Sequence, residues 1–206
     1  MLSKEVQAQR LLGTLVPFVT SAAASKDGER KRLVLVDAMT DAQVSEMYTM
    51  ICSAAAAGQG FGVDEYTKEE DFRRDIADGY RFAIMDKNSG QLLAAFILAV
   101  SKYSRGCHVA DPFIIVRDDQ RGQGLGTLCL DLCVDMAARL GFQGMYVDTF
   151  SNNRAMIRVI ESFPGFRQVG CLPMGGLMTD GQVVGTVIYY KDLRSDSQEW
   201  TSVVDS

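Results

Sequence analysis

The feature that most constrains the fold is a glycine-rich segment, Arg121–Gly126 (RGQGLG), between an apolar run and an amphipathic one. The apolar run, Val109–Val116, predicts a buried strand. After the glycines, apolar residues recur at helical spacing as far as Leu140, and Gly141 ends the pattern. Because glycine is costly inside regular structure, three glycines at alternate positions indicate a backbone that turns tightly or approaches a ligand closely. The sequence therefore predicts a strand, a tight loop and a helix whose N-terminal amides can bind an anion.

Two common phosphate-binding motifs do not fit this spacing. A P-loop needs GxxxxGK[ST], and no Lys-Ser or Lys-Thr pair follows the glycines. The dinucleotide fingerprint GxGxxG needs glycine where the chain has Thr127, and it normally follows the first strand of its domain. The predicted anion site therefore belongs to another class.

The rest of the chain predicts an α/β domain. Asp86–Gly90 (DKNSG) is typical of a hairpin turn, and Thr67 with Glu70 fits a capping box at the start of a helix. Asp111-Pro112 interrupts the strand before the glycines. Since proline has no N–H to donate, that strand is expected to contain a bulge or to splay from a neighbour. Hairpins and crossover helices in one chain indicate a mixed central sheet with helices on both faces. We expect further strands at 33–36, 81–85, 92–101, 145–150, 166–171 and 183–190, and helices at 42–57, 67–78 and 154–163.

Three parts are expected along the chain. Residues 1–30 form an N-terminal extension, residues 31–195 the domain, and residues 196–206 a C-terminal tail. Spaced apolar residues in 1–25 fit one helix face, whereas Glu5 and the scarcity of arginine argue against a transit peptide. The extension is therefore expected to be a docking helix or a tail.

Charge and composition exclude several classes of function. The chain has 206 residues and a net charge of −5, which disfavours binding to nucleic acid. Its longest apolar run, Leu92–Val100, is too short to span a bilayer, so we expect no membrane contact. Five cysteines without a CxxC pair argue against a disulfide framework and a zinc site, and they favour a cytoplasmic protein. Cys129 and Cys133 are expected to pack in the core.

The segment Gln120–Gly126 (QRGQGLG) resembles the (Q/R)xxGx(G/A) loop with which the GNAT superfamily of GCN5-related N-acetyltransferases binds the pyrophosphate of acyl-CoA. Its setting is similar too, with an interrupted strand before it and Asn153 opening a later helix. The resemblance covers residues 33–193. It implies a single GNAT-type domain with a splayed or bulged strand at the acyl-CoA site, and an enzyme that uses acetyl-CoA as co-substrate and no metal.

On the donor side, the resemblance implies three sets of contacts. The amides of Arg121–Thr127 hold the pyrophosphate. The pantetheine chain pairs with the splayed strand at Ile114–Val116, where one amide stabilises the thioester oxygen. Asn153 contacts the cofactor and supports catalysis, besides capping its helix. The predicted cofactor-binding residues are Ile114, Ile115, Val116, Arg121, Gly122, Gln123, Gly124, Leu125, Gly126, Thr127 and Asn153.

A narrower similarity is to the fungal L-azetidine-2-carboxylate (proline-analogue) acetyltransferases. It rests on 104–116 (SRGCHVADPFIIV), 148–166 (DTFSNNRAMIRVIESFPGF) and 187–193 (VIYYKDL). This branch implies an amino acid or its analogue as acceptor, and it favours a homodimer.

The acceptor side centres on Asp111, where the fungal branch has asparagine. A carboxylate there is able to take the proton of the attacking amine or to bind its ammonium form, and a structural salt bridge is the alternative. His108, the only histidine, is a second candidate base, with a structural role as its alternative. The predicted catalytic residues are therefore Asp111, Asn153 and His108. The walls of the acceptor site are expected to come from Phe61, Asp64, Glu65 and Tyr66.

The usual general acid of the superfamily is missing. Many members have a tyrosine seven residues after the helix-opening asparagine, and it protonates the departing thiolate. In this chain that position is Ile160, and the fungal branch also lacks the tyrosine there. Tyr189 and Tyr190 are substitutes in principle, but their positions favour a place in the sheet or core.

The expected function is transfer of an acetyl group from acetyl-CoA to the amine of a small molecule by direct attack. The acceptor would be an amino acid or analogue, or a polyamine. Two alternatives remain. The missing tyrosine favours a CoA-binding regulatory module with little catalysis, and an acetyltransferase of protein or peptide amines is the other.

Overall fold

The computed structural model describes residues 19–20, 32–57, 66–101, 104–178 and 180–194. Its strands form one sheet in the order β1-β2-β3-β4-β5-β6-β8-β7. Neighbouring strands are antiparallel except β5 and β6, which are parallel, so the predicted mixed sheet is confirmed. The strands are β1 Val19–Thr20, β2 Leu33–Val36, β3 Tyr80–Asp86, β4 Leu92–Val100, β5 Val109–Val116, β6 Gly144–Phe150, β7 Arg167–Leu177 and β8 Val183–Asp192. The helices are α2 Asp41–Ala56, α3 Glu69–Asp75, α4 Leu125–Arg139 and α5 Arg154–Ser162, with short 3₁₀ turns at Ser104–Gly106 and Asp118–Gln120.

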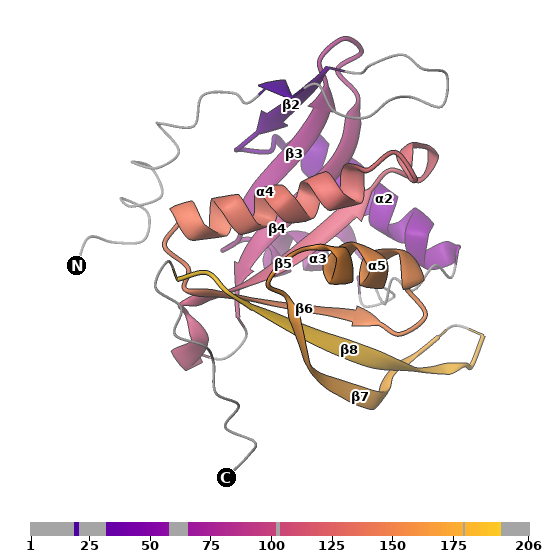
Figure 1. Cartoon of the computed structure of the whole chain (residues 1–206). Helices are drawn as coiled ribbons and strands as arrows, with labels where there is room; N and C mark the ends of the chain where they lie inside the picture. The colour runs from indigo at the N-terminus through magenta and orange to yellow at the C-terminus, as the bar shows by residue number, and fades with distance from the viewer. Residues whose placement is uncertain (1–18, 21–31, 58–65, 102–103, 179, 195–206) are drawn as a thin grey trace.

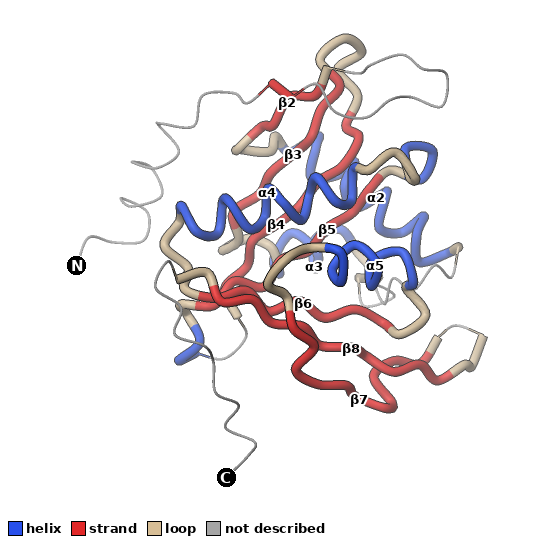
Figure 2. Tube along the Cα trace, viewed as in Figure 1, coloured by secondary structure: helices blue, strands red, loops and turns tan. Residues whose placement is uncertain are grey.

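Helices cover both faces of the sheet, as predicted. Figure 1 shows α4 and α5 on the near face and α2 and α3 behind the strands, and Figure 2 shows the strands running between the two helical layers. Alternate side chains of each strand enter opposite cores. Phe96 and Leu98 of β4 pack with α4, whereas Ala95 and Ile97 pack with α2 and α3. β4 is buried along most of its length and is the centre of the domain.

The two helices behind the sheet begin in different ways. At α2, Thr40 Oγ1 accepts a hydrogen bond from Gln43 N (3.3 Å), and Gln43 Oε1 accepts one from Thr40 N (2.9 Å), which is a capping box. The predicted capping box of Thr67 and Glu70 is wrong, because α3 begins at Glu69 after Lys68, whose side chain makes no cap bond. Acidic residues fill the first turn of α3, where the helix dipole favours negative charge, so the helix starts without a hydroxyl cap.

β7 is longer than the sequence indicates. The predicted strand 166–171 stops at Cys171, but the observed strand continues through a Gly- and Pro-rich stretch to Leu177 and pairs with β8 again at Gly176 after a register shift. A Cβ on Gly175 would collide with Thr186, and one on Gly176 would collide with Phe150. These glycines are therefore required by close approach of the backbone to neighbouring groups.

Most of the predicted extension, 1–18 and 21–30, and the tail 196–206 lie outside the described residues. Within the extension, Val19–Thr20 forms a strand paired with Leu33 and Val34, so a helix throughout 1–25 is wrong at these two positions. Among the described helices, none is long and apolar enough to cross a membrane. Cys129 and Cys133 are buried as predicted, and burial raises the pKa of Cys129 to about 12.

Candidate functional site

The predicted interruption of β5 is a splay from β6. β5 pairs with β4 from Ala110 to Val116 without a register shift, so there is no bulge on that side. Its pairing with β6 covers only Val109 and Ala110, after which the two strands separate. Pro112 lies just beyond the last paired residue.

Two hydrogen bonds fix the direction in which the β5 backbone faces. Arg117 N–H donates to Leu93 O (2.9 Å), and Ser101 N–H donates to Val109 O (3.0 Å). In an antiparallel ladder, residues at every second position exchange hydrogen bonds with the partner strand. The odd-numbered residues of β5 therefore bond to β4, and the backbone groups of the even-numbered residues face the splay.

This orientation explains why proline is tolerated at position 112, and it shows which β5 amides face the splay. A backbone N–H at position 112 would face the splay and have no partner on a neighbouring strand. Pro112 has no N–H, so no donor is left unpaired there. Ile114 and Val116 direct their amides into the splay, whereas the amide of Ile115 faces β4. Of the three predicted β5 residues, Ile114 and Val116 are thus the ones whose amides a ligand lying in the splay would meet.

The glycine-rich loop leaves further amides free. Gly122 (φ 77°) and Gly124 (φ 81°) have left-handed backbone conformations, which L side chains adopt at a cost. Gly124 caps α4 without a side chain, and Leu128 N–H makes a 3.0 Å hydrogen bond to Gly124 O. The amides of residues 125–127 precede this bond and point out of the helix end, where the helix dipole favours an anion.

The conformation of Gly124 allows a prediction. An added Cβ at this position would meet no atom within 4 Å, so its cost comes from backbone strain and from blocking the ligand. Gly124→Val is expected to raise the KM for acetyl-CoA more than Gly124→Ala, because a β-branched side chain is larger and tolerates a left-handed backbone less well. Steady-state kinetics at varied acetyl-CoA concentration measures this difference. Equal KM values for the two variants would argue against close approach of a ligand to the loop.

Arg121 holds the loop against the end of β5. Its Nε donates to Val116 O (3.3 Å), its Nη1 lies 3.0 Å from Asp118 Oδ1, and its side chain is 33% exposed. Its own amide donates to Asp118 O (3.3 Å), so that amide, predicted to bind pyrophosphate, is already used in the turn. Since Arg121 lines the cavity described below, its guanidinium, rather than its amide, is the part left to contact a ligand there.

A cavity of about 910 Å³ opens between the end of β5, the start of α4 and helix α5. This volume suits a large organic ligand. Ten of the eleven predicted cofactor-binding residues line the cavity; the exception is Gln123, whose Nε2 instead donates to Gln120 Oε1 (3.4 Å). The lining residues are Ile114, Ile115, Val116, Arg121, Gly122, Gly124, Leu125, Gly126, Thr127, Asn152, Asn153, Arg154, Ala155, Met156, Arg158, Val159 and Ser162.

Sequence reasoning missed two cationic residues of this lining, Arg154 and Arg158. A signal was present, because two arginines four residues apart share one face of a helix, and the first opens the helix, where cations are disfavoured. In the part of the chain that the structure describes, no group of three His, Cys, Asp or Glu side chains is placed to hold a metal.

Asn153 has the capping role that was predicted for it. Its Oδ1 accepts a hydrogen bond from Met156 N (3.2 Å) at the start of α5, and it also lines the cavity. Because that oxygen caps the helix, the Nδ2 group is the part of the side chain left to donate to a ligand.

Ile160 and the two tyrosines lie away from the cavity. Ile160 is fully buried in the core between α5 and the sheet, and it does not line the cavity. Tyr189 is also buried, with its hydroxyl donating to Glu161 Oε1 (3.0 Å), and burial raises its pKa to about 12. Neither Tyr189 nor Tyr190 lines the cavity, which agrees with their predicted place in the sheet and core.

Ile160→Tyr is therefore expected to destabilise the protein without raising kcat. The larger side chain must enter a filled core, at a cost of about 1–3 kcal/mol. Thermal unfolding and acetyl-transfer rates measure the two effects. A folded variant with a higher kcat would show that the tyrosine reaches the thiolate and that thiolate protonation limits the rate.

Asp111 lies on the opposite side of β5 from α4. It pairs with Ala99 of β4 one position after β5 leaves β6, and by alternation it shares a sheet face with Phe113 and Ile115, which pack with α2 and α3. His108 precedes the strand, is exposed and does not line the cavity; its carbonyl accepts from Gln143 N (2.8 Å). The geometry thus brings Asp111 nearer than His108 to the splay.

Of the predicted acceptor walls, Phe61, Asp64 and Glu65 lie outside the described residues, and Tyr66 is described. Tyr66 packs edge-on against Phe72 of α3, and its hydroxyl donates to Asp75. Tyr48 of α2 donates to the Tyr66 carbonyl (3.0 Å). Tyr66 is therefore held by both helices behind the sheet, in the same core as Phe113.

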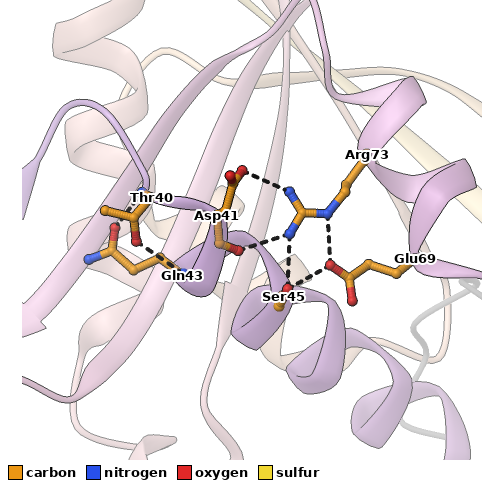
Figure 3. Close-up of polar contacts among 6 residues, drawn as sticks. All are labelled: Thr40, Asp41, Gln43, Ser45, Glu69 and Arg73. Atoms are coloured by element: carbon orange, nitrogen blue, oxygen red, sulfur yellow. Dashed lines mark hydrogen bonds and ion pairs between the residues drawn. The ribbon is translucent and has the colours of Figure 1, made fainter.

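One arginine joins these two helices. Figure 3 shows the Arg73 guanidinium between α3 and the start of α2, with hydrogen bonds to Asp41, Ser45 and Glu69. Hydrogen bonds from Ser45 and Arg73 lower the pKa of Glu69, so this carboxylate stays charged at neutral pH. The network fixes α3, and hence Tyr66, beside α2.

Comparison with known proteins identifies a family to which this chain belongs. The model of the acetyltransferase (GNAT) family matches residues 46–166, more than half of the chain. A comparison with curated proteins found no significant match.

Solved structures share the fold over nearly their whole length. A GCN5-related N-acetyltransferase from Kribbella flavida is 24% identical, with a TM-score of 0.68, and the match covers 78% of this chain and 98% of that one. A GNAT superfamily phosphinothricin acetyltransferase from Sinorhizobium meliloti, in complex with acetyl-CoA, is 16% identical with a TM-score of 0.70, covering 83% and 96%. The ribosomal-protein-S18-alanine N-acetyltransferase of Escherichia coli is 18% identical with a TM-score of 0.62, covering 82% and 99%.

Proposed function

The chain belongs to the acetyltransferase (GNAT) family, and we propose that it transfers the acetyl group of acetyl-CoA to the amine of a small molecule. The acceptor would be an amino acid, an amino acid analogue or a polyamine. The observation that carries the proposal is the position of Asp111, a carboxylate residue one position beyond the last pairing of β5 with β6, where the splay opens.

Different residues of the chain would bind acetyl-CoA, stabilise the charge on the carbonyl oxygen and take the proton of the amine. Acetyl-CoA supplies an activated thioester, with the arginine-rich cavity as its binding site. Of the amides of Ile114 and Val116, one donates to the carbonyl oxygen, which gains negative charge when an amine attacks the carbonyl carbon. Removing such a donor typically costs about 10²–10³ in rate. Asp111 takes a proton from the amine, which attacks only in its neutral form.

The missing general acid does not oppose catalysis. No tyrosine lines the cavity in the described part of the chain, so protonation of the departing thiolate is left to water. Coenzyme A thiolate is a tolerable leaving group near neutral pH. Because no tyrosine among the described residues lines the cavity, the alternative to an acetyltransferase is a CoA-binding module with little catalysis. Such a module would bind CoA without turnover.

The named neighbours favour two acceptor classes. A phosphinothricin acetyltransferase is consistent with a small amino acid analogue, as is the similarity of 104–116 and 148–166 to the fungal azetidine-2-carboxylate enzymes. The S18-alanine enzyme is consistent with a protein N-terminus.

A competition assay separates these acceptor classes. Equimolar peptides and free amino acids, with polyamines in a parallel mixture, are incubated with acetyl-CoA, and acetylated products are quantified by mass spectrometry. The proposal expects free small amines to be acetylated first. Predominant acetylation of peptides would overturn the small-molecule assignment in favour of the protein-amine alternative.

The chain is also expected to form a homodimer through the β7–β8 hairpin. Within the described residues, the exposed large apolar side chains all lie on this hairpin, at Val169, Leu172, Met174, Leu177 and Val183. β7 is an edge strand of the sheet, and exposed apolar edges favour association. Light scattering should give about twice the chain mass of 22.6 kDa, and Leu177→Lys should lower it towards one chain. A wild-type mass of one chain at tens of micromolar would contradict this.

A further inference from the structure

The charges of the cavity are of one sign. Arg121, Arg154 and Arg158 line it, and none of its lining residues is Asp or Glu. The chain as a whole carries a net charge of −5. A cationic lining in an acidic protein indicates a ligand with several negative charges.

The two arginines of α5 are not used to hold the structure together. Among the described residues, neither Arg154 nor Arg158 makes an ion pair or a side-chain hydrogen bond, whereas Arg121 bonds to Asp118 and Val116. Glu161 lies three residues after Arg158, within reach along the helix, but it accepts from Tyr189 Oη (3.0 Å) instead. Both guanidinium groups therefore remain available to a ligand.

The position of the two arginines does not favour the stability of helix α5. Arg154 is the first residue of α5, where the positive end of the helix dipole disfavours a cation. Arg158 follows one turn later on the same face, and both are exposed, whereas Ile157 and Ile160 take the buried face. Helix stability does not explain two arginines here, and an anion between them would.

We propose that Arg154 and Arg158 bind the 3′-phosphate on the ribose of coenzyme A, which makes the protein selective for CoA over 3′-dephospho-CoA. The inference rests on the proposed function, because it takes acetyl-CoA as the ligand of the cavity. CoA carries a pyrophosphate and, separately, a ribose phosphate. The amides and Arg121 at the start of α4 suit the first, and a pair of planar guanidinium groups on α5 suits the second, a terminal phosphate with three free oxygens.

Calorimetric titration with CoA and with 3′-dephospho-CoA tests this directly. The wild type is expected to bind CoA about 10- to 100-fold more tightly, the range for charge-assisted hydrogen bonds to a phosphate. Arg154→Gln/Arg158→Gln should bind both ligands alike, with its CoA affinity reduced to the level of 3′-dephospho-CoA. Arg167→Gln, the same type of substitution at one exposed arginine of β7 outside the cavity, should keep the wild-type preference.

Two results would overturn the inference: equal binding of both ligands by the wild type, or a double variant that weakens both ligands by the same factor. The titration needs no acceptor and no turnover. Failure to acetylate any small amine would therefore count against the proposed function alone, while absence of the CoA preference in the wild type would count against the arginine pair alone.

Discussion

Arg121→Glu is expected to abolish measurable acetyl-CoA binding while the domain stays folded. The substitution removes the guanidinium that joins the loop to Val116 O, and it sets a carboxylate beside Asp118 and against the incoming pyrophosphate. Each effect weakens the same site, and a fixed negative charge there also repels the ligand at a distance. Calorimetric titration with acetyl-CoA measures the loss, and circular dichroism checks the fold.

Two further variants separate charge from loop geometry. Arg121→Lys keeps the positive charge but loses the planar fork, so it should weaken binding less than glutamate does. Asp118→Asn removes the partner of Arg121 and keeps the cationic cavity; exposed ion pairs contribute little, so its effect should be small. Unchanged acetyl-CoA affinity in Arg121→Glu would exclude this loop as the anion site.

Asp111→Asn is expected to lower kcat/KM for the acceptor by about 10²-fold or more, the usual scale for losing a general base. An amine acceptor arrives mostly as ammonium, and asparagine can neither take its proton nor balance its charge. The loss should shrink as the pH rises, because free amine becomes plentiful. Acetyl-CoA affinity should hardly change, since Asp111 lies on the opposite face of β5 from α4 and does not line the cavity.

The controls for Asp111 are Asp111→Glu and Asp131→Asn. The first keeps a carboxylate and should retain part of the activity; the second makes the same change at an exposed site on α4 outside the cavity and should have no effect. Full activity of folded Asp111→Asn at neutral pH would make Asp111 structural, and His108 would be the next base to test.

The backbone around the glycine-rich loop could be predicted because its signals are local. Pro112, Gly124 and Asn153 each impose a backbone feature through their own chemistry: a missing donor, a left-handed cap and a side-chain cap. Such features depend little on distant parts of the chain. The observed positions of β5, the glycine-rich loop and α4 therefore agree with those predicted from the sequence.

Features that depend on contacts between distant segments could not be predicted. Gly175 and Gly176 look like a loop in sequence, but β8 and Phe150 pack so closely that only glycine fits within the strand. Ile160 occupies the position of a family tyrosine, yet only the packing of α5 on the sheet shows that this position is fully buried. The hydrogen bond from Tyr189 to Glu161 likewise joins β8 to α5, two segments far apart in the sequence.

Thiol release from acetyl-CoA, measured across a panel of free amino acids, amino acid analogues and polyamines, tests the central claim most directly. We expect acceptor-dependent release of CoA with at least one of these amines, together with one acetylated product for each thiol released. Absence of turnover with every amine of the panel, while the protein still binds acetyl-CoA, would contradict the proposed acetylation of small amines.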